Sequence, residues 1–244
     1  MARLARVVIP DVPHHITQRG NRRQRTFFCN QDYEDYKEFM ATWCRKHGVD
    51  VWAYCLMPNH VHLIAVPECE SALRSAIGEA HRRYTRAVNQ REGWRGHLWQ
   101  GRFASYPMDP GHLFHCARYV ELNPVRAGLV STPEEWSHSS ARAHLMRQDD
   151  GFVNVGPLLE RIGDWRAFLG ERQQADLARD IRAHETTGRP LGDSVFVEDL
   201  ERLVGRRLRP RRRGPRPGRS PASPDSERSH LRLASSDETV AGVE

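Results

Sequence analysis

The sheet of this protein is decided by Leu56-Met57-Pro58-Asn59-His60-Val61-His62-Leu63-Ile64-Ala65-Val66. The apolar, β-branched run from position 60 predicts a strand, and the Pro-Asn pair before it predicts a tight turn. Alternate side chains of a strand share a face, so His60 and His62 project together while the intervening valine points the other way. Two such imidazoles are either a two-point metal site or an ordinary hydrogen-bonded pair at a strand edge.

Outward from this stretch, the pattern of apolar residues predicts the other elements. We expect strands at residues 12–19, 50–57, 60–67 and 102–108, and helices at 31–48, 70–90 and 111–122. A tight turn between two strands makes the sheet antiparallel there. The alternation favours an α+β fold, a ferredoxin-like antiparallel sheet with helices on one face. The two histidines would lie on a central strand, with the last helix laid across their face.

That last helix carries a second candidate group. Apolar residues recur along it at helical spacing, and Tyr119 and Asn123 are four residues apart, so they lie on one helix face. Pro124 disfavours helical dihedrals at Asn123, which makes this residue a candidate helix terminator. Taken alone, Tyr119 is better explained as a ring packed at the margin of the core.

The chain divides by composition. Residues 1–145 suffice for one domain with its own core. Residues 146–207 predict an accessory helical region of three or so short helices, one of which begins near the N-cap candidate Asp193 and continues to Leu203. Residues 208–244 are rich in arginine and then in Ser, Pro and acidic residues. We expect a disordered tail whose basic part binds polyanions without sequence choice.

Charge points to a nucleic-acid partner. The chain has a net charge of +6, and its first 30 residues hold six arginines against one acidic residue. Four arginines lie on or beside a predicted turn after the first strand: Arg19, Arg22, Arg23 and Arg25. Their guanidinium groups are suited to gripping phosphates or reading guanine edges, although a merely solvated basic turn has the same composition.

A second cluster, residues 91–103, mixes aromatic and cationic side chains with glycines. Unpaired bases stack on exposed rings, which contributes about 1–3 kcal/mol per base. We therefore expect Trp94, Arg95 and Arg102 at the nucleic acid and Phe103 inside.

The cysteines and the apolar runs indicate the cellular compartment of the protein. Five cysteines show no CxxC spacing, which indicates buried thiols in a reducing cytoplasm. No run of 18 apolar residues and no secretory leader is visible, so we expect no membrane contact and a cytoplasmic protein near the nucleoid.

Four blocks in this order resemble the single-tyrosine HUH transposases, specifically their REP-associated (RAYT) branch. The blocks are His15-Ile16-Thr17-Gln18-Arg19-Gly20-Asn21-Arg22-Arg23, the His60-Val61-His62 segment, Trp99-Gln100-Gly101-Arg102-Phe103, and Tyr119-Val120-Glu121-Leu122-Asn123-Pro124-Val125-Arg126-Ala127-Gly128-Leu129-Val130. They span about residues 10–145. Residues 187–192, TGRPLG, look like a segment that many members carry.

The resemblance implies a DNA strand-transfer enzyme that recognises hairpins of repetitive extragenic palindromes and cuts single-stranded DNA beside them. It implies that His60 and His62 bind a divalent metal, that Tyr119 is the nucleophile and that Asn123 is the third protein ligand. Related insertion-sequence transposases usually carry a glutamine there, one methylene longer. In this family the tyrosine becomes linked to the 5′ phosphate and leaves a free 3′ hydroxyl. The RAYT branch is associated with monomers, and we add Arg126 of the last block to the candidate DNA-binding residues.

The chemistry is consistent with that assignment. Deprotonating a tyrosine with a pKa near 10 at pH 7 costs about 4 kcal/mol. Mg²⁺ or Mn²⁺ offsets charge on a scissile phosphate, and two imidazoles, an amide oxygen and open water positions suit such an ion.

Other histidine-based enzymes fit less well. A histidine-triad hydrolase needs a third alternate histidine where this chain has Ile64, and a metal-dependent barrel needs further ligands. A non-catalytic ferredoxin-like module that binds structured single-stranded nucleic acid stays open. It predicts binding that survives Tyr119→Phe and chelators, without a covalent adduct.

Overall fold

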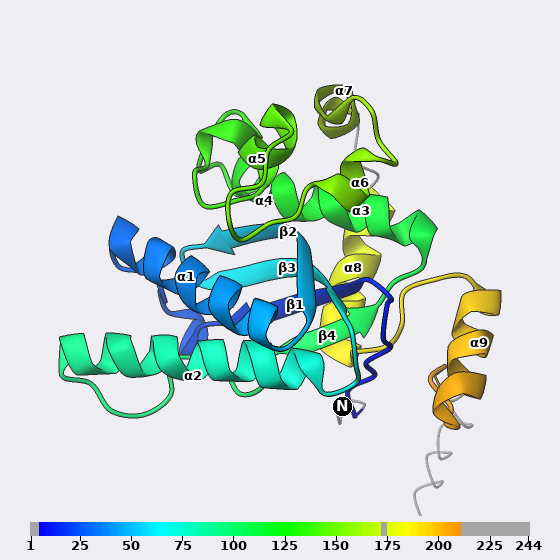
Figure 1. Ribbon diagram of the computed structural model, residues 1–244, viewed down its shortest axis with the longest axis horizontal. Helices are drawn as coiled ribbons and strands as arrows, with labels where there is room; N and C mark the ends of the chain where they lie inside the picture. Colours follow the sequence, from blue (N-terminus) through cyan, green and yellow to red (C-terminus); the bar gives the residue numbers. More distant parts are fainter. Residues whose placement is uncertain (1–4, 172–174, 211–244) are drawn as a thin grey trace, which may run out of the picture. The chain divides into compact units, whose positions relative to one another are not determined.

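The computed structural model describes residues 5–171 and 175–210 (Figure 1). The predicted tail at 208–244 lies outside these residues, except for its first three positions. Among the described helices, none has the length and apolar character needed to cross a membrane.

Four strands form one antiparallel sheet. They are β1 (His14–Arg19), β2 (Val49–Met57), β3 (His60–Pro67) and β4 (Ala104–Pro107), in the order β2-β3-β1-β4. The Pro58-Asn59 turn joins β2 to β3 as a hairpin, so the histidine strand is central, as the sequence predicts.

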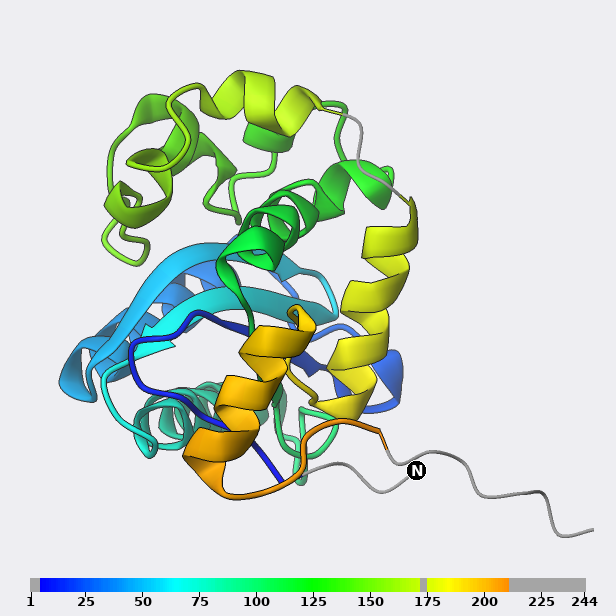
Figure 2. The same cartoon turned by 90° about the vertical axis from the view of Figure 1, so that its right-hand side faces the viewer.

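Helices cover both faces of this sheet (Figure 2). The chain forms α1 (Asn30–Lys46), α2 (Ala72–Glu92), α3 (Pro110–Glu121), α4 (Asn123–Arg126), α5 (Ala141–Met146), α6 (Gly156–Leu159), α7 (Trp165–Gly170), α8 (Ala175–Thr187) and α9 (Ser194–Val204), with 3₁₀ turns η1 (Asn21–Arg23) and η2 (Pro133–Glu135). Helices α1 and α2 form the layer on one face, and α3 and α8 lie against the other. The predicted α+β class with an antiparallel sheet is confirmed, whereas the prediction of helices on one face only is wrong, because α3 and α8 cover the second face.

The two layers explain the composition of β3. Val61 and Leu63, which point to one face, are fully buried, and so are His62 and Ile64 on the opposite face. A strand covered on both sides shows a nearly continuous apolar run instead of a polar and apolar alternation. A histidine on such a strand is therefore held away from bulk water.

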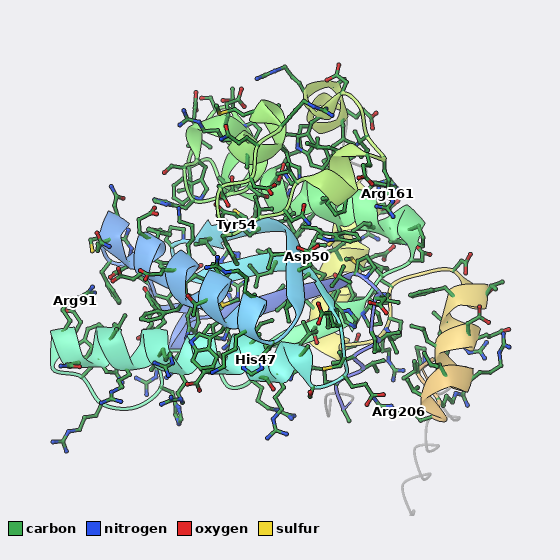
Figure 3. The ribbon with its side chains drawn as sticks, in the orientation of Figure 1. His47, Asp50, Tyr54, Arg91, Arg161 and Arg206 are labelled. Atoms are coloured by element: carbon green, nitrogen blue, oxygen red, sulfur yellow. The ribbon has the colours of Figure 1, made fainter. Side chains whose placement is uncertain are left out.

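The accessory region is fastened to the sheet at its β2 edge. The Tyr54 hydroxyl donates to Asp150 at 2.5 Å, and Asp50 accepts a hydrogen bond from Asn154 Nδ2 at 3.0 Å (Figure 3). The main-chain N–H of Asn154 also donates to the Val51 carbonyl at 2.8 Å. Covering the edge strand in this way blocks pairing with another chain.

A buried carboxylate of α3 binds both the accessory region and the segment just before it. Glu121 has no exposed surface and accepts hydrogen bonds from Ser140 Oγ (2.5 Å), His144 Nδ1 (2.6 Å) and Trp165 Nε1 (2.8 Å). Three donors to one carboxylate satisfy a group that would otherwise be costly to bury. The helix that carries Tyr119 is thus held in place two residues beyond that tyrosine.

The segment after α8 is tied to the start of α3. The Asp109 carboxylate caps α3 through the His112 N–H (2.7 Å) and also accepts the Asp193 N–H (2.9 Å). Asp193 in turn caps α9 by accepting the Phe196 N–H at 2.8 Å. The predicted helix start near Asp193 is therefore confirmed.

Candidate active site

Strand register gathers five side chains on one face of the sheet. In the β1–β3 pair, Arg19 lies opposite His60 and Thr17 lies opposite His62. Residues that face each other in antiparallel strands point the same way, and His15 joins them because it is two residues from Thr17. This face is the one that α3 and α8 cover.

His60 is oriented by its neighbour in the turn. Its Nδ1 lies 2.6 Å from Asn59 Oδ1, and Asn59 Nδ2 donates to the Arg23 carbonyl at 3.1 Å. An amide oxygen only accepts, so His60 donates from Nδ1 and keeps the lone pair on Nε2. Burial, assisted by the charge of Arg19, lowers the pKa of His60 to about 3, so the ring is neutral at pH 7.

His62 lies deeper than His60, and the two ring centres are 5.0 Å apart. Its Nδ1 is 3.0 Å from His15 Nε2 and 3.7 Å from Glu185 Oε1. Burial first, and then the repulsion that a protonated His62 would meet from His60, His15 and the nearby arginines, hold the pKa of His62 well below its usual value. A neutral imidazole is the form that binds a metal ion.

Helix α3 brings Tyr119 to this face. The centre of its ring is 5.8 Å from that of His62 and 6.4 Å from that of His15, with the planes nearly perpendicular. The Tyr119 side chain is buried. Tyr119 and His62, which are 57 positions apart in the chain, therefore lie side by side.

The protonation of Tyr119 is set by opposing influences. Burial raises its pKa, and the charge of Glu185 adds to that increase. A hydrogen bond from the Arg182 side chain and the charges of Arg126 and Arg182 act in the opposite direction. Arg126, one of the predicted DNA-binding residues, places its guanidinium carbon 4.1 Å from the centre of the Tyr119 ring.

Asn123 follows a break in the helix. Helix α3 ends at Glu121, and Asn123 is the first residue of α4 instead of the helix terminator that its proline neighbour suggested. In the described part of the chain, its Nδ2 is buried without a hydrogen-bond partner, and its carboxamide makes no hydrogen bond to either β3 histidine. The Asn123 amide nitrogen therefore makes no hydrogen bond to another described residue.

Sequence reasoning missed a carboxylate at the site. Ligand atoms of His15, His62 and Glu185 all lie within 4.8 Å of one another. Glu185 Oε1 is buried with no hydrogen-bond partner among residues 5–171 and 175–210, and burial raises the pKa of Glu185 to about 7 against the charges of nearby arginines. Both ring nitrogens of His15 are hydrogen-bonded, to Tyr106 and His62, so within this group His62 and Glu185 are the donors left for a divalent cation. The one feature of the sequence that could have indicated Glu185 is its location two residues before the TGRPLG segment.

A cleft of about 600 Å³ opens over the histidines. Its walls are Thr17, Gln18, Arg19, Arg23, His60, His62, Gln100, Arg102, Ala104, Arg182, Glu185 and Thr186. Three predicted DNA-binding arginines thus share one cleft with both β3 histidines. The cleft is cationic on the side of β1 and has α8 as its other wall.

The remaining predicted DNA-binding residues lie outside this cleft. Arg22 and Arg25 are exposed on and just after η1, and Trp94 and Arg95 are exposed beyond the end of α2. Phe103 is buried, as predicted.

Comparison with known proteins finds similar transposases. Residues 9–123 match the family model described as "Transposase IS200 like". A REP-associated tyrosine transposase of Haemophilus influenzae is 25% identical over 126 residues, which cover 47% of this chain and 69% of the relative. One from Escherichia coli is 21% identical over 127 residues, covering 52% and 74%.

A solved structure shares the fold. It is a REP-associated tyrosine transposase bound to a REP hairpin, and it superposes with a TM-score of 0.53 at 22% identity over 64% of this chain and 90% of that one. His60, His62, Tyr119 and Asn123 all lie within the residues that match the IS200-like transposase model, and the proteins similar to this chain include REP-associated tyrosine transposases.

Proposed function

We propose that this protein is a DNA strand transferase that binds hairpin-forming single-stranded palindromic repeats and cleaves and rejoins them through a covalent 5′-phosphotyrosine. The observation that carries the proposal is the approach of the Tyr119 ring to His62, at 5.8 Å between ring centres, within one chain. Because both groups belong to one protomer, the arrangement favours a monomer. The proposed setting is the cytoplasm, on chromosomal DNA.

In the proposed reaction, the Tyr119 oxygen attacks the scissile phosphorus. A bond forms between that oxygen and the 5′ phosphate, the bond to the 3′ oxygen breaks, and the released 3′ oxygen takes up a proton. Because the phosphotyrosine retains the bond energy, a 3′ hydroxyl can reverse the step and reseal the strand. Arg126 and Arg182 favour the reactive phenolate through their charge.

His60 and His62 would hold Mg²⁺ or Mn²⁺ through Nε2, with the Asn123 carboxamide as the proposed third ligand. When bound, the ion would polarise the phosphate and offset its developing charge. Support comes from two neutral imidazoles that line the cleft, and from Glu185 as a further oxygen donor. A set of nitrogen and oxygen donors without thiolates suits these ions better than structural zinc.

The hairpin partner is proposed on two grounds. A relative of the same fold is solved with a REP hairpin, and the cleft presents Arg19, Arg23 and Arg102 beside the histidines. Arginine forks suit phosphate oxygens and guanine edges. The exposed Arg22, Arg25, Trp94 and Arg95 would contact DNA outside the cleft.

The test is incubation of the protein with single-stranded hairpin oligonucleotides and Mn²⁺, followed by a denaturing gel. We expect a shifted covalent band from the wild type and none from Tyr119→Phe, with hairpin binding by the variant within a few fold. Tyr36→Phe is the matched control, because it removes a buried hydroxyl whose only described partner is His81. A wild type that binds the hairpin but never forms the band would instead be a non-catalytic binding module.

A further inference from the structure

Behind the histidine face, four polar groups form a continuous hydrogen-bonded line. His62 Nδ1 is 3.0 Å from His15 Nε2, and His15 Nδ1 is 2.7 Å from the Tyr106 hydroxyl. That hydroxyl donates to the main-chain carbonyl of Ile181 in α8, at 3.4 Å. The ring planes of His15 and His62 are nearly parallel, at 6°, and His15, His62 and Tyr106 are all buried.

The direction of this line follows from its last acceptor. A carbonyl oxygen only accepts, so the Tyr106 proton points to Ile181 and the hydroxyl oxygen accepts from His15 Nδ1–H. A neutral His15 then has a bare Nε2, which accepts from His62 Nδ1–H. The one ring proton of His62 is thereby placed on Nδ1, and its Nε2 keeps a lone pair.

The reverse direction would have the opposite effect on His62. If Tyr106 donated to His15, then His15 Nε2–H would donate to His62 Nδ1, and the proton of His62 would sit on Nε2. A protonated Nε2 has no lone pair for a metal ion. Only one polarity of the line leaves His62 able to act as a ligand on the side away from His15.

We propose that His15 and Tyr106 are positioning residues that fix His62 as the Nδ1–H tautomer and so prepare its Nε2 for the divalent ion. This inference rests on the proposed function, in which His62 is a ligand. It matches the role that Asn59 plays for His60, where a 2.6 Å contact occupies Nδ1. Groups behind a metal-ligating histidine commonly set its tautomer, and their loss typically weakens metal affinity by about 10–100-fold.

Tyr106→Phe tests the inference with little change in packing, because it removes only the hydroxyl from a fully buried ring. His15 Nδ1 then has no acceptor, and a buried unpaired N–H is less favourable than an unpaired lone pair. The His15 proton should therefore move to Nε2 and reverse the line. His62 would then carry its proton on Nε2.

Two measurements report the outcome. Long-range ¹H–¹⁵N spectra of metal-free, ¹⁵N-histidine-labelled protein should show His62 protonated on Nδ1 in the wild type and on Nε2 in Tyr106→Phe. Calorimetry should show Mn²⁺ affinity about tenfold weaker in the variant. Tyr36→Phe is again the matched control: it removes a phenol hydroxyl 2.8 Å from a buried histidine, His81, and should change neither readout.

A second pair of variants serves if Tyr106→Phe does not fold. His15→Gln presents an amide oxygen that can accept from His62 Nδ1–H, so it should keep the tautomer and the Mn²⁺ affinity, whereas His15→Met should lose both. The inference is overturned if His62 of the wild type carries its proton on Nε2, or if Tyr106→Phe or His15→Met binds Mn²⁺ like the wild type. A wild type with the Nδ1–H tautomer that binds no Mn²⁺ would refute the metal in the proposed function and leave the tautomer assignment standing.

Discussion

The guanidinium carbon of Arg126 lies 4.1 Å from the centre of the Tyr119 ring, and Arg126 Nη2 donates to the Tyr119 carbonyl at 2.8 Å. One side chain thus contacts both the ring and the backbone of the proposed nucleophile. A cation over an aromatic ring is attracted to it, and its charge also favours a phenolate.

Replacing Arg126 by methionine should therefore slow adduct formation. At neutral pH we expect a loss on the order of tenfold to a hundredfold, because a charge that stabilises the reacting oxygen is removed. The rate should also reach its half-maximum at a higher pH, since the Arg126 charge lowers the pKa of Tyr119. Single-turnover rates between pH 6 and pH 10 measure both effects.

Arg161→Met is the control for this substitution, because Arg161 lies over the Trp52 ring, at 5.6 Å, in a different part of the molecule (Figure 3). Its pH profile should match that of the wild type. An Arg126→Met profile that also matches would contradict the role given to Arg126.

Removing either proposed metal ligand should stop cleavage. His60→Ala and His62→Ala should form no adduct, excess Mn²⁺ should not restore it, and EDTA should abolish the activity of the wild type. The denaturing gel used for Tyr119→Phe gives the readout. His47→Ala is the control, since His47 stacks on Trp43 at 5.6 Å between ring centres. Adduct formation that persists in EDTA would contradict the metal role.

The arginines of the cleft should contribute to hairpin affinity mainly through phosphate contacts. Arg19→Ala and Arg102→Ala should each weaken binding and reduce the slope of log affinity against log salt by about one. Fluorescence anisotropy at several salt concentrations measures both quantities. Arg166→Ala, which removes an arginine paired with Glu134 in the accessory region, should leave the slope unchanged. An unaltered slope for the cleft variants would place the DNA elsewhere.

Glu121 should be among the most sensitive positions for stability. Glu121→Ala leaves buried donors on Ser140, His144 and Trp165 without their acceptor, and should lower the free energy of unfolding by about 3 kcal/mol or more. Urea denaturation measures this. Glu135→Ala, at an exposed cap, should cost about 1 kcal/mol. Equal effects of the two substitutions would show that the buried network adds little.

Acid should destabilise the fold through its buried histidines. Burial lowers the pKa of His14 to about 4 and that of His81 to about 3. His14 also accepts the Ile9 N–H at Nε2, a bond that protonation would break. Between those values and 6.5 the unfolded chain binds more protons than the folded one, so the free energy of unfolding falls as the pH falls through this window.

At pH 5 each of these two histidines should reduce the free energy of unfolding by about 2 kcal/mol relative to pH 7. Urea denaturation at the two pH values tests this, and His81→Gln should show a shallower dependence than the wild type. A wild type whose stability is the same at both pH values would contradict the expectation.

The sequence predicted those parts of the site that depend on local periodicity. The shared face of His60 and His62 follows from the two-residue repeat of a strand, and the α9 start follows from the capping preference of Asp193. The tyrosine role came from resemblance to a family and stays a prediction.

The missed residues depend on contacts that no local pattern encodes. His15 reaches the site through the register between β1 and β3, and register is set by tertiary packing. Glu185 lies on a helix near the other end of the described chain, where an acidic residue ordinarily faces water. The pairing of β1 with β3 and the packing of α8 are therefore what complete the site.

Helix α8, which forms one wall of the cleft, is synthesised after the residues that it covers. His15, His60, His62 and Tyr119 are all translated before Arg182 and Glu185, which lie about 60 residues after Tyr119. At bacterial and eukaryotic rates of translation, that interval lasts roughly 3–12 s. During it, the nascent chain would expose its imidazoles and phenol on the side that α8 later encloses. Ions or polynucleotides would reach them from a direction that is closed once translation is complete.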